Sequence, residues 1–186
     1  MDDKKIIKLY FERSQKAIAE TARKYGRYCH YIAFNIVGND SDAEECVNDT
    51  YLRVWNAIPP KRPDNLQTFI GKITRNLALN RYEKMSAQKR GAGQIPLILD
   101  ELYECIPDKN GDEKIVDDII IKRTIDAFLS ELQTDSRKIF IRRYWYMCSV
   151  KEIAQEYGIT ESKVCVSLYR TREKLKKKLE EEGISV

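Results

Sequence analysis

Residues 149–164 have the sequence SVKEIAQEYGITESKV, and this stretch carries the strongest structural signal in the chain. Ser149 followed three positions later by Glu152 is the pattern of a capping box, which starts an α-helix. Gly158 permits the left-handed turn at which a helix ends, and Thr160 is suited to cap the next helix. These signals occur at the spacing that two short crossed helices require, so the stretch predicts a helix-turn-helix.

The second helix of this motif has an apolar stripe and a polar outer face. The stripe consists of Val164, Leu168, Leu175 and Leu179. The opposite face of such a helix enters the DNA major groove in helix-turn-helix proteins. The candidate DNA-binding residues are Ser162, Lys163, Cys165 and Val166 near base edges, and Arg170, Arg172 and Lys174 near phosphates. A purely structural helical hairpin would have the same spacing of core residues. The cap, the glycine and the small residues all occur at the positions that a helix-turn-helix requires, and this agreement favours DNA binding.

The chain before this motif is also helical in pattern, because apolar residues recur at intervals of three and four rather than two. A short helix is predicted over about residues 6–11, and a longer one over about residues 14–37 that stops at Gly38. Its apolar stripe is Ile18, Ala22, Tyr25, Cys29, Ile32 and Ile36. Ser41 and Glu44 predict a further capping box and a helix that ends before Pro59. The predicted fold class is therefore all-α.

A basic and aromatic face is predicted on the helix that follows the basic loop 59–65. Its apolar stripe consists of Leu66, Phe69, Ile70, Ile73 and Leu77. The residues expected on the opposite, exposed side are Arg75, Ala78, Leu79 and Tyr82. Such a face can hold phosphates and stack against unpaired bases, as single-stranded nucleic acid requires. An ordinary solvated face with one tyrosine explains the same residues equally well.

Charge is unevenly distributed along the 186 residues, whose net charge is +4. Residues 61–91 carry a net charge of +6, residues 92–120 of −6 and residues 121–186 of +4. This pattern could place two DNA-binding surfaces on either side of a tether that repels phosphates, although solvated helix faces would also produce it. Glycine, proline and acidic residues predict a flexible linker over 91–120. Two small helical domains, 1–90 and 121–186, would flank it. The apolar first half of the linker, around Ile98, is expected to dock as a short helix on a domain or a partner.

Several function classes are disfavoured by composition. The five cysteines have no close pair and the single histidine, His30, has no companion, so neither a metal site nor a disulfide framework is expected. No cofactor is expected, because no glycine-rich phosphate loop occurs, and the absence of a convergent titratable cluster argues against an enzyme. No membrane-length apolar run or signal peptide is recognised, so a cytoplasmic protein without direct membrane insertion is predicted.

Three segments resemble, in order, the extracytoplasmic-function (ECF) group of bacterial sigma factors, a subfamily of the sigma-70 family. Residues 42–55, DAEECVNDTYLRVW, are similar to the family's D-A-E-D-x-x-Q-E-x-F-x-x-x-W segment. Residues 68–82, TFIGKITRNLALNRY, resemble its W-L-x-x-I-A-R-N-x-x-x-D helix. Residues 132–178 resemble the module that recognises the −35 element. One departure is Cys165-Val166-Ser167 where relatives often carry K-S-R, which makes Lys163 and Arg170 the expected −35 contacts.

The resemblance implies a sigma factor that binds core RNA polymerase through its β and β′ subunits and directs transcription initiation at −10 and −35 elements. It implies polymerase contacts at Asp49, Arg53 and Trp55, although a lone tryptophan is as often a core residue. It implies −10 contacts at Arg75, Asn76, Asn80, Arg81, Tyr82 and Lys84, with Tyr82 as a stacking group. It also implies promoter DNA and an anti-sigma protein as partners, a membrane-anchored form among the candidates, and a role in a stress response.

A second interpretation is a stand-alone helix-turn-helix transcriptional regulator with an N-terminal sensing or dimerisation domain. Such a regulator needs no polymerase subunit and would bind duplex DNA alone, often as a dimer on a palindrome.

Overall fold

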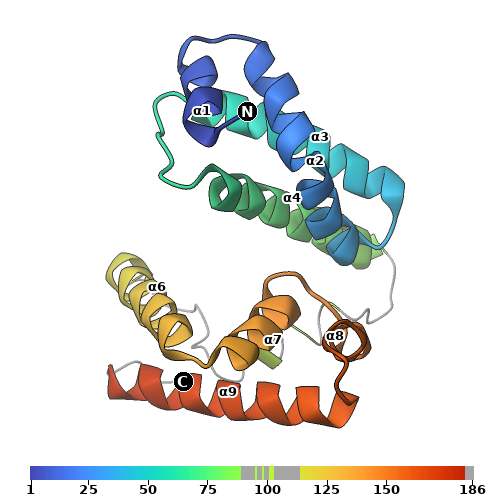
Figure 1. The fold of residues 1–186 in the computed structure, drawn as a ribbon, viewed down its shortest axis with the longest axis vertical. Helices are drawn as coiled ribbons and strands as arrows, with labels where there is room; N and C mark the ends of the chain where they lie inside the picture. The colour runs from blue at the N-terminus through green and yellow to red at the C-terminus, as the bar shows by residue number, and fades with distance from the viewer. Residues whose placement is uncertain (89–94, 96–97, 99–100, 103–113, 183–186) are drawn as a thin grey trace. The chain divides into compact units, whose positions relative to one another are not determined.

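The computed structural model describes residues 1–88, 95, 98, 101–102 and 114–182, and all regular elements in these ranges are α-helices (Figure 1). The all-α prediction is thereby confirmed for the described residues. The chain forms two compact units, Met1–Gly91 and Ala92–Val186. No helix in the described ranges has an apolar stretch long enough to cross a bilayer.

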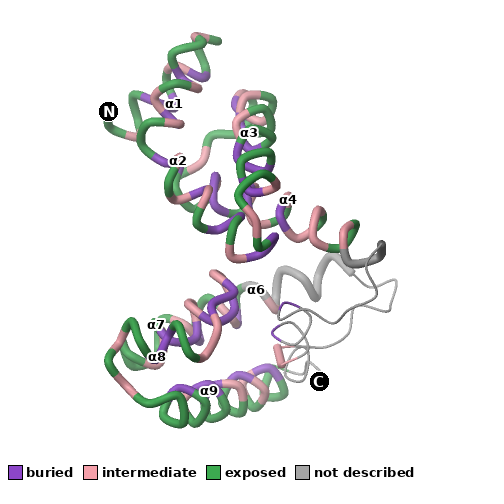
Figure 2. Tube along the Cα trace, turned by 90° about the vertical axis from the view of Figure 1, so that its right-hand side faces the viewer, coloured by how far each residue is buried: buried purple, intermediate pink, exposed green. Residues whose placement is uncertain are grey.

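The first unit is built from α1 (Asp3–Phe11), α2 (Lys16–Val37), α3 (Asp40–Ala57) and α4 (Leu66–Gln88). α2 packs against both α3 and α4, which also pack against each other, and α1 covers one end of α2. Figure 2 marks the buried residues on the facing sides of these helices. The core includes Ile6, Ile7, Tyr10, Ala17, Tyr25, Cys29, Val47, Val54, Ile58, Leu66 and Ile70. Complete burial of one large apolar side chain contributes about 1.5 to 3 kcal/mol.

The N-terminal end of α2 is rotated relative to the predicted stripe. Ala17 and Thr21 are fully buried, whereas Ile18 and Ala22 are only partly buried. The reason is a buried hydrogen-bond network. The Thr21 hydroxyl lies 2.8 Å from the buried Tyr10 hydroxyl and donates to the Ala17 carbonyl oxygen. A buried phenol requires a hydrogen-bonding partner, and Thr21 provides one. From Tyr25 onward the predicted stripe is confirmed.

The start of α3 differs from the prediction. Gly38 ends α2 in the left-handed conformation, with φ +77°, as expected. The N-cap of α3, however, is Asn39, whose Oδ1 accepts from the Asp42 backbone N–H at 2.9 Å. The predicted capping box at Ser41 is wrong, because Asn39 is an equally good cap and comes directly after the helix stop.

Gly71 of α4 lies directly against Tyr28 of α2. A Cβ atom at this position would lie 2.4 Å from the Tyr28 hydroxyl oxygen. No side chain fits there without displacing Tyr28, so glycine is required by the approach of the two helices rather than by its backbone conformation.

Alkaline pH is expected to destabilise the first unit through Tyr51, which lies partly buried on α3. Burial, with smaller effects from Cys29 and Tyr10, raises the pKa of Tyr51 to about 12. An unfolded tyrosine ionises near pH 10, so the stability contributed by neutral Tyr51 is complete below about pH 10 and is lost as pH rises towards 12. We expect Tyr51→Phe to reduce the fall in unfolding free energy across this window, as measured by urea unfolding with circular dichroism. An equally steep fall in the variant would contradict this prediction.

The second unit contains α6 (Lys114–Glu131), α7 (Thr134–Tyr144), α8 (Val150–Tyr157) and α9 (Glu161–Glu181). α9 packs against the other three helices. Phe140 lies between Phe128 and Tyr144, with ring centroids 6.3 Å and 4.6 Å away. The buried apolar residues include Phe128, Ile139, Phe140, Tyr144, Ile153, Val164, Leu168, Leu175 and Leu179.

The predicted helix-turn-helix is confirmed at each of its local signals. Ser149 and Glu152 form both hydrogen bonds of the capping box at the start of α8. Gly158 has φ +62°, and the Thr160 hydroxyl accepts from the Lys163 backbone N–H at 3.2 Å. The turn and the cap of α9 thus follow from residues within a few positions of each other.

Candidate nucleic-acid and polymerase interfaces

The outer face of α9 exposes most of the residues predicted to bind DNA. The exposed members are Ser162, Lys163, Cys165, Val166, Arg170 and Lys174. Figure 2 shows the buried residues of α9 on the side facing α7 and exposed residues on the opposite side. Tyr169, which is 58% exposed, and Val166, which is 47% exposed, add apolar surface beside the cations. Such a surface can contact both phosphates and base edges.

Arg172 occupies a different position from the one predicted. Its side chain is only 16% exposed and lies 3.6 Å from the Glu101 carboxylate. The guanidinium also donates to the Tyr144 hydroxyl at 2.8 Å. The sequence predicts that Arg172 contacts DNA phosphates, whereas in the structure its guanidinium is paired with Tyr144 and Glu101 within the second unit, because α9 presents this position to α7 rather than to solvent.

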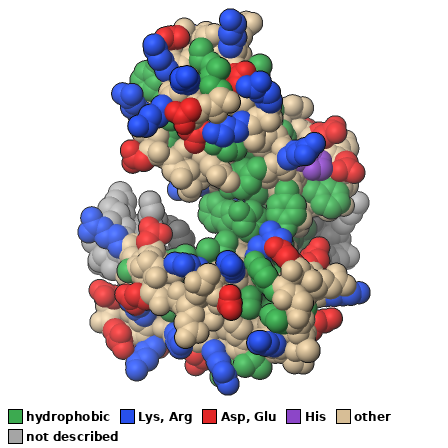
Figure 3. Space-filling model, in the orientation of Figure 1, with side chains coloured by type: hydrophobic (Ala, Val, Ile, Leu, Met, Phe, Trp, Pro, Cys, Tyr) green, Lys and Arg blue, Asp and Glu red, His purple; other side chains and the backbone are tan. Residues whose placement is uncertain are grey.

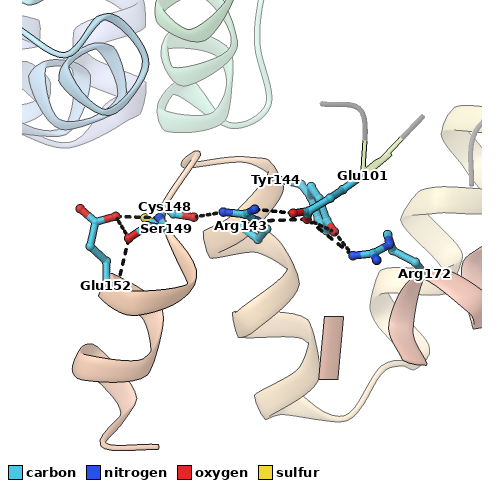
Figure 4. Close-up of polar contacts among 7 residues, drawn as sticks. All are labelled: Glu101, Arg143, Tyr144, Cys148, Ser149, Glu152 and Arg172. Atoms are coloured by element: carbon cyan, nitrogen blue, oxygen red, sulfur yellow. Dashed lines mark hydrogen bonds and ion pairs between the residues drawn. The ribbon is translucent and has the colours of Figure 1, made fainter. Parts of the chain in front are cut away.

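The Glu101 cluster consists of Glu101, Arg143, Tyr144 and Arg172 (Figure 4). Arg143 donates to both carboxylate oxygens of Glu101 and, at 3.1 Å, to the Cys148 carbonyl oxygen. The Tyr144 hydroxyl donates to the same carboxylate at 3.1 Å, and burial raises the pKa of this phenol. Three donors thus converge on one acceptor, and the Arg143 side chain is only 7% exposed.

Glu101 falls within the predicted flexible linker 91–120, and the structure corrects that assignment at this residue. The carboxylate is bound to α7 and α9, and Ile95 and Ile98 are buried. This agrees with the prediction that the apolar first half of the linker docks. Residues 91–94, 96–97, 99–100 and 103–113 lie outside the described residues. The sequence patterns described above did not identify this cluster, because its acidic member lies 42 residues before Arg143.

On α4 the predicted −10 residues divide between exposed and enclosed positions. Asn76, Asn80 and Lys84 are exposed, whereas Arg75 and Tyr82 are partly buried. Ala78, predicted on the outer face, is fully buried. Because the core positions Leu66, Ile70, Thr74 and Ala78 step by four residues, the stripe drifts around a helix of 3.6 residues per turn. Ala78 therefore faces the core where Leu77 was predicted.

Arg81 is bound on the α3 side of α4. Its Nε donates to the Asp42 carboxylate at 2.6 Å, and the guanidinium also pairs with Glu45. Both carboxylates raise the pKa of Arg81, Glu45 more strongly. Its side chain is 30% exposed. Sequence reasoning placed Arg81 among the −10 contacts and did not identify these two partners.

The predicted polymerase-binding residues lie along α3. Asp49 and Arg53 are exposed, and the neighbouring Leu52 is 58% exposed. Trp55 is partly buried: its ring centroid is 6.1 Å from that of Tyr10, and the Arg13 guanidinium lies 5.4 Å from the Trp55 centroid. Trp55 thus contributes to packing within the first unit, and its role in polymerase binding stays a prediction.

The single histidine, His30, is partly exposed on α2. Its Nε2 is 3.3 Å from the Asp40 carboxylate, and its ring stacks on Phe34 with centroids 6.0 Å apart. Figure 3 shows this histidine beside hydrophobic side chains. Within the described ranges, no cluster of histidine, cysteine or acidic residues could hold a metal ion.

The chain consists of two helical units, and the second contains a helix-turn-helix. This architecture places it in the class of two-domain helix-turn-helix proteins. Residues 21–88 match the family model of Sigma-70 region 2, and residues 122–175 match that of Sigma-70, region 4. Together the matches cover well over half of the sequence, so the chain belongs to the sigma-70 family.

A curated relative supports the ECF group within this family. The chain is 24% identical over 158 residues to the ECF RNA polymerase sigma factor SigE of Mycolicibacterium smegmatis, covering 84% of this chain and 59% of that relative. The chain thus spans less than two thirds of the relative's length. Among solved structures it is similar to CnrH in complex with the cytosolic domain of CnrY, with a TM-score of 0.44, 19% identity and coverage of 96% of this chain and 97% of that chain. The family models confirm the predicted membership of the sigma-70 family, and the SigE relative is an ECF sigma factor.

Proposed function

We propose that this protein is an ECF sigma factor, which binds core RNA polymerase and directs initiation at promoters with −10 and −35 elements. The observation that carries the proposal is the presence of both sigma-70 regions, in order, in one chain. The proposed activity is binding and positioning rather than catalysis. The stand-alone regulator is disfavoured, because residues 21–88 match a sigma region where that interpretation needs a sensing domain.

The exposed faces of α3, α4 and α9 suggest that each face binds a different partner. The α3 face with Asp49, Leu52 and Arg53 suits the β and β′ subunits of the polymerase, since it combines charges with an exposed apolar side chain. The α4 residues proposed for the −10 element are Arg75, Asn76, Asn80 and Lys84, with Tyr82 for stacking. The outer face of α9 is proposed for the −35 duplex.

Further partners and location follow from this function. A sigma factor acts on chromosomal DNA, so we place the protein in the cytoplasm. An anti-sigma protein, with a membrane-anchored form among the candidates, would switch transcription off by covering the DNA-binding faces. Release of the sigma factor under stress would restore transcription.

Promoter-dependent transcription tests the proposal. Purified chain and core RNA polymerase are incubated with a library of DNA fragments from the source genome, and transcript 5′ ends are sequenced. We expect start sites that are absent with core enzyme alone and that share two upstream elements. The Arg53→Glu variant should lose these transcripts but keep its affinity for duplex DNA, because Arg53 is exposed on α3 and the helix-turn-helix is unaltered. Transcripts identical to those of core enzyme alone, or dimeric binding to a palindrome, would refute the proposal.

A further inference from the structure

One ion-pair group joins the start of α3 to the C-terminal half of α4. The Arg81 guanidinium binds the carboxylates of Asp42 and Glu45 together. Asp42 is held in place in turn, because its second oxygen accepts from the Asn39 side-chain amide at 2.6 Å. The Asp42 side chain is 18% exposed, so this pair is better shielded from solvent than an ordinary surface ion pair.

A second polar link connects the same two helices in the core. The Thr50 and Thr74 hydroxyl oxygens lie 3.1 Å apart and both residues are fully buried, while each hydroxyl also lies within hydrogen-bonding distance of the carbonyl oxygen four residues earlier in its own helix. Asp42 and Thr50 are separated by about two turns of helix, or roughly 12 Å along α3. The two polar links thus join α3 and α4 at two separate points along their contact.

We propose that Arg81 is a positioning residue and not a −10 DNA contact. Through Asp42 and Glu45 it fixes the rotation of the α4 segment that exposes Asn80 and Lys84. The inference rests on the proposed function, since it concerns how that function's −10 face is held. These ion pairs thereby link α3, the proposed polymerase-binding helix, to α4, the proposed −10 helix.

The two possible roles of Arg81 predict effects of opposite sign. If Arg81 contacted phosphates, its carboxylates would compete with DNA, and removing them would free the guanidinium and strengthen binding. If Arg81 positions α4, removing the carboxylates would weaken binding as much as removing Arg81 itself. Combined variants would then be no worse than single ones, because groups that act as one unit are not additive.

The experiment measures affinity of the holoenzyme for a fluorescent promoter fragment obtained from the transcription experiment. The variants are Arg81→Gln, the pair Asp42→Asn with Glu45→Gln, and all three changes together. We expect each to weaken promoter binding about fivefold, with unchanged affinity for core polymerase. Glu44→Gln is the matched control, because Glu44 is an exposed neighbouring carboxylate on α3 and its loss should change affinity less than twofold. Far-UV circular dichroism spectra that match the spectrum of the unaltered chain show that each variant still folds.

Several results would overturn the inference. They are tighter promoter binding after the carboxylates are neutralised, additive losses in the combined variant, and a salt dependence whose slope falls by about one when Arg81 is replaced, as expected for a lost phosphate contact. Unchanged affinity in all variants would overturn it as well. If the chain forms no holoenzyme, the proposed function fails, and the same variants are then compared for binding of the full chain to random-sequence single-stranded DNA.

Discussion

Replacement of Glu101 by glutamine is expected to destabilise the second unit by about 2 to 3 kcal/mol. Removing one partner of a fully buried ion pair costs about 3 to 5 kcal/mol, because the other charge stays buried without compensation. Here the Glu101 side chain keeps 30% exposure, so solvent screening lowers the expected cost. The Arg143 guanidinium, at 7% exposure, cannot move to water without disrupting α7 and its bond to Cys148.

Tryptophan fluorescence can isolate this effect. The chain contains two tryptophans, Trp55 in the first unit and Trp145 in the second. In a Trp55→Phe background, urea unfolding followed by Trp145 fluorescence reports the second unit alone. Glu180→Gln, at an exposed site on α9, is the matched control and should change stability by less than about 0.5 kcal/mol. An equal effect of the two substitutions would show that Glu101 is an ordinary linker residue.

The second large effect is expected in DNA binding by α9. Alanine at both Lys163 and Arg170 should weaken holoenzyme binding to a −35-containing promoter about 100-fold, since each specific contact contributes about 1 to 3 kcal/mol. Both side chains are exposed, and with no basic residue at Cys165-Val166-Ser167 they are the first two cations of this face, ahead of Lys174. The slope of log affinity against log salt should decrease by about one for each lost phosphate contact.

Arg172→Ala provides the contrast to this double variant. Because Arg172 is bound to Tyr144 and Glu101, its loss should lower the stability of the second unit and leave the salt slope unchanged. Lys5→Ala, which removes an exposed cation in the first unit, is the control for net charge. If Arg172→Ala lowered the slope while Lys163→Ala with Arg170→Ala did not, the assignment of the DNA face would be wrong.

The local sequence was sufficient to predict those structural features whose hydrogen bonds join residues close together in the chain. The capping box at Ser149, the left-handed turn at Gly158 and the cap at Thr160 involve groups at most a few residues apart, so their pattern predicts their geometry. The same is true of the stop at Gly38. The local pattern did not, however, distinguish between two good capping residues that lie close together. Asn39 rather than Ser41 caps α3, because the preceding helix ends beside Asn39.

Tertiary packing decided the roles of the long charged side chains. Arg81 finds Asp42 at a separation of 39 residues, and Arg143 finds Glu101 at a separation of 42. The apolar stripe of α9 places position 172, four residues after Leu168, beside the core and position 170 away from it, but nothing in the local pattern identifies the partners of Arg172. The sequence by itself determined which segments are helical and which family they belong to, because periodicity and capping are local. The partner of each arginine was determined only when distant helices packed, since a flexible side chain pairs with whichever carboxylate the fold brings within reach.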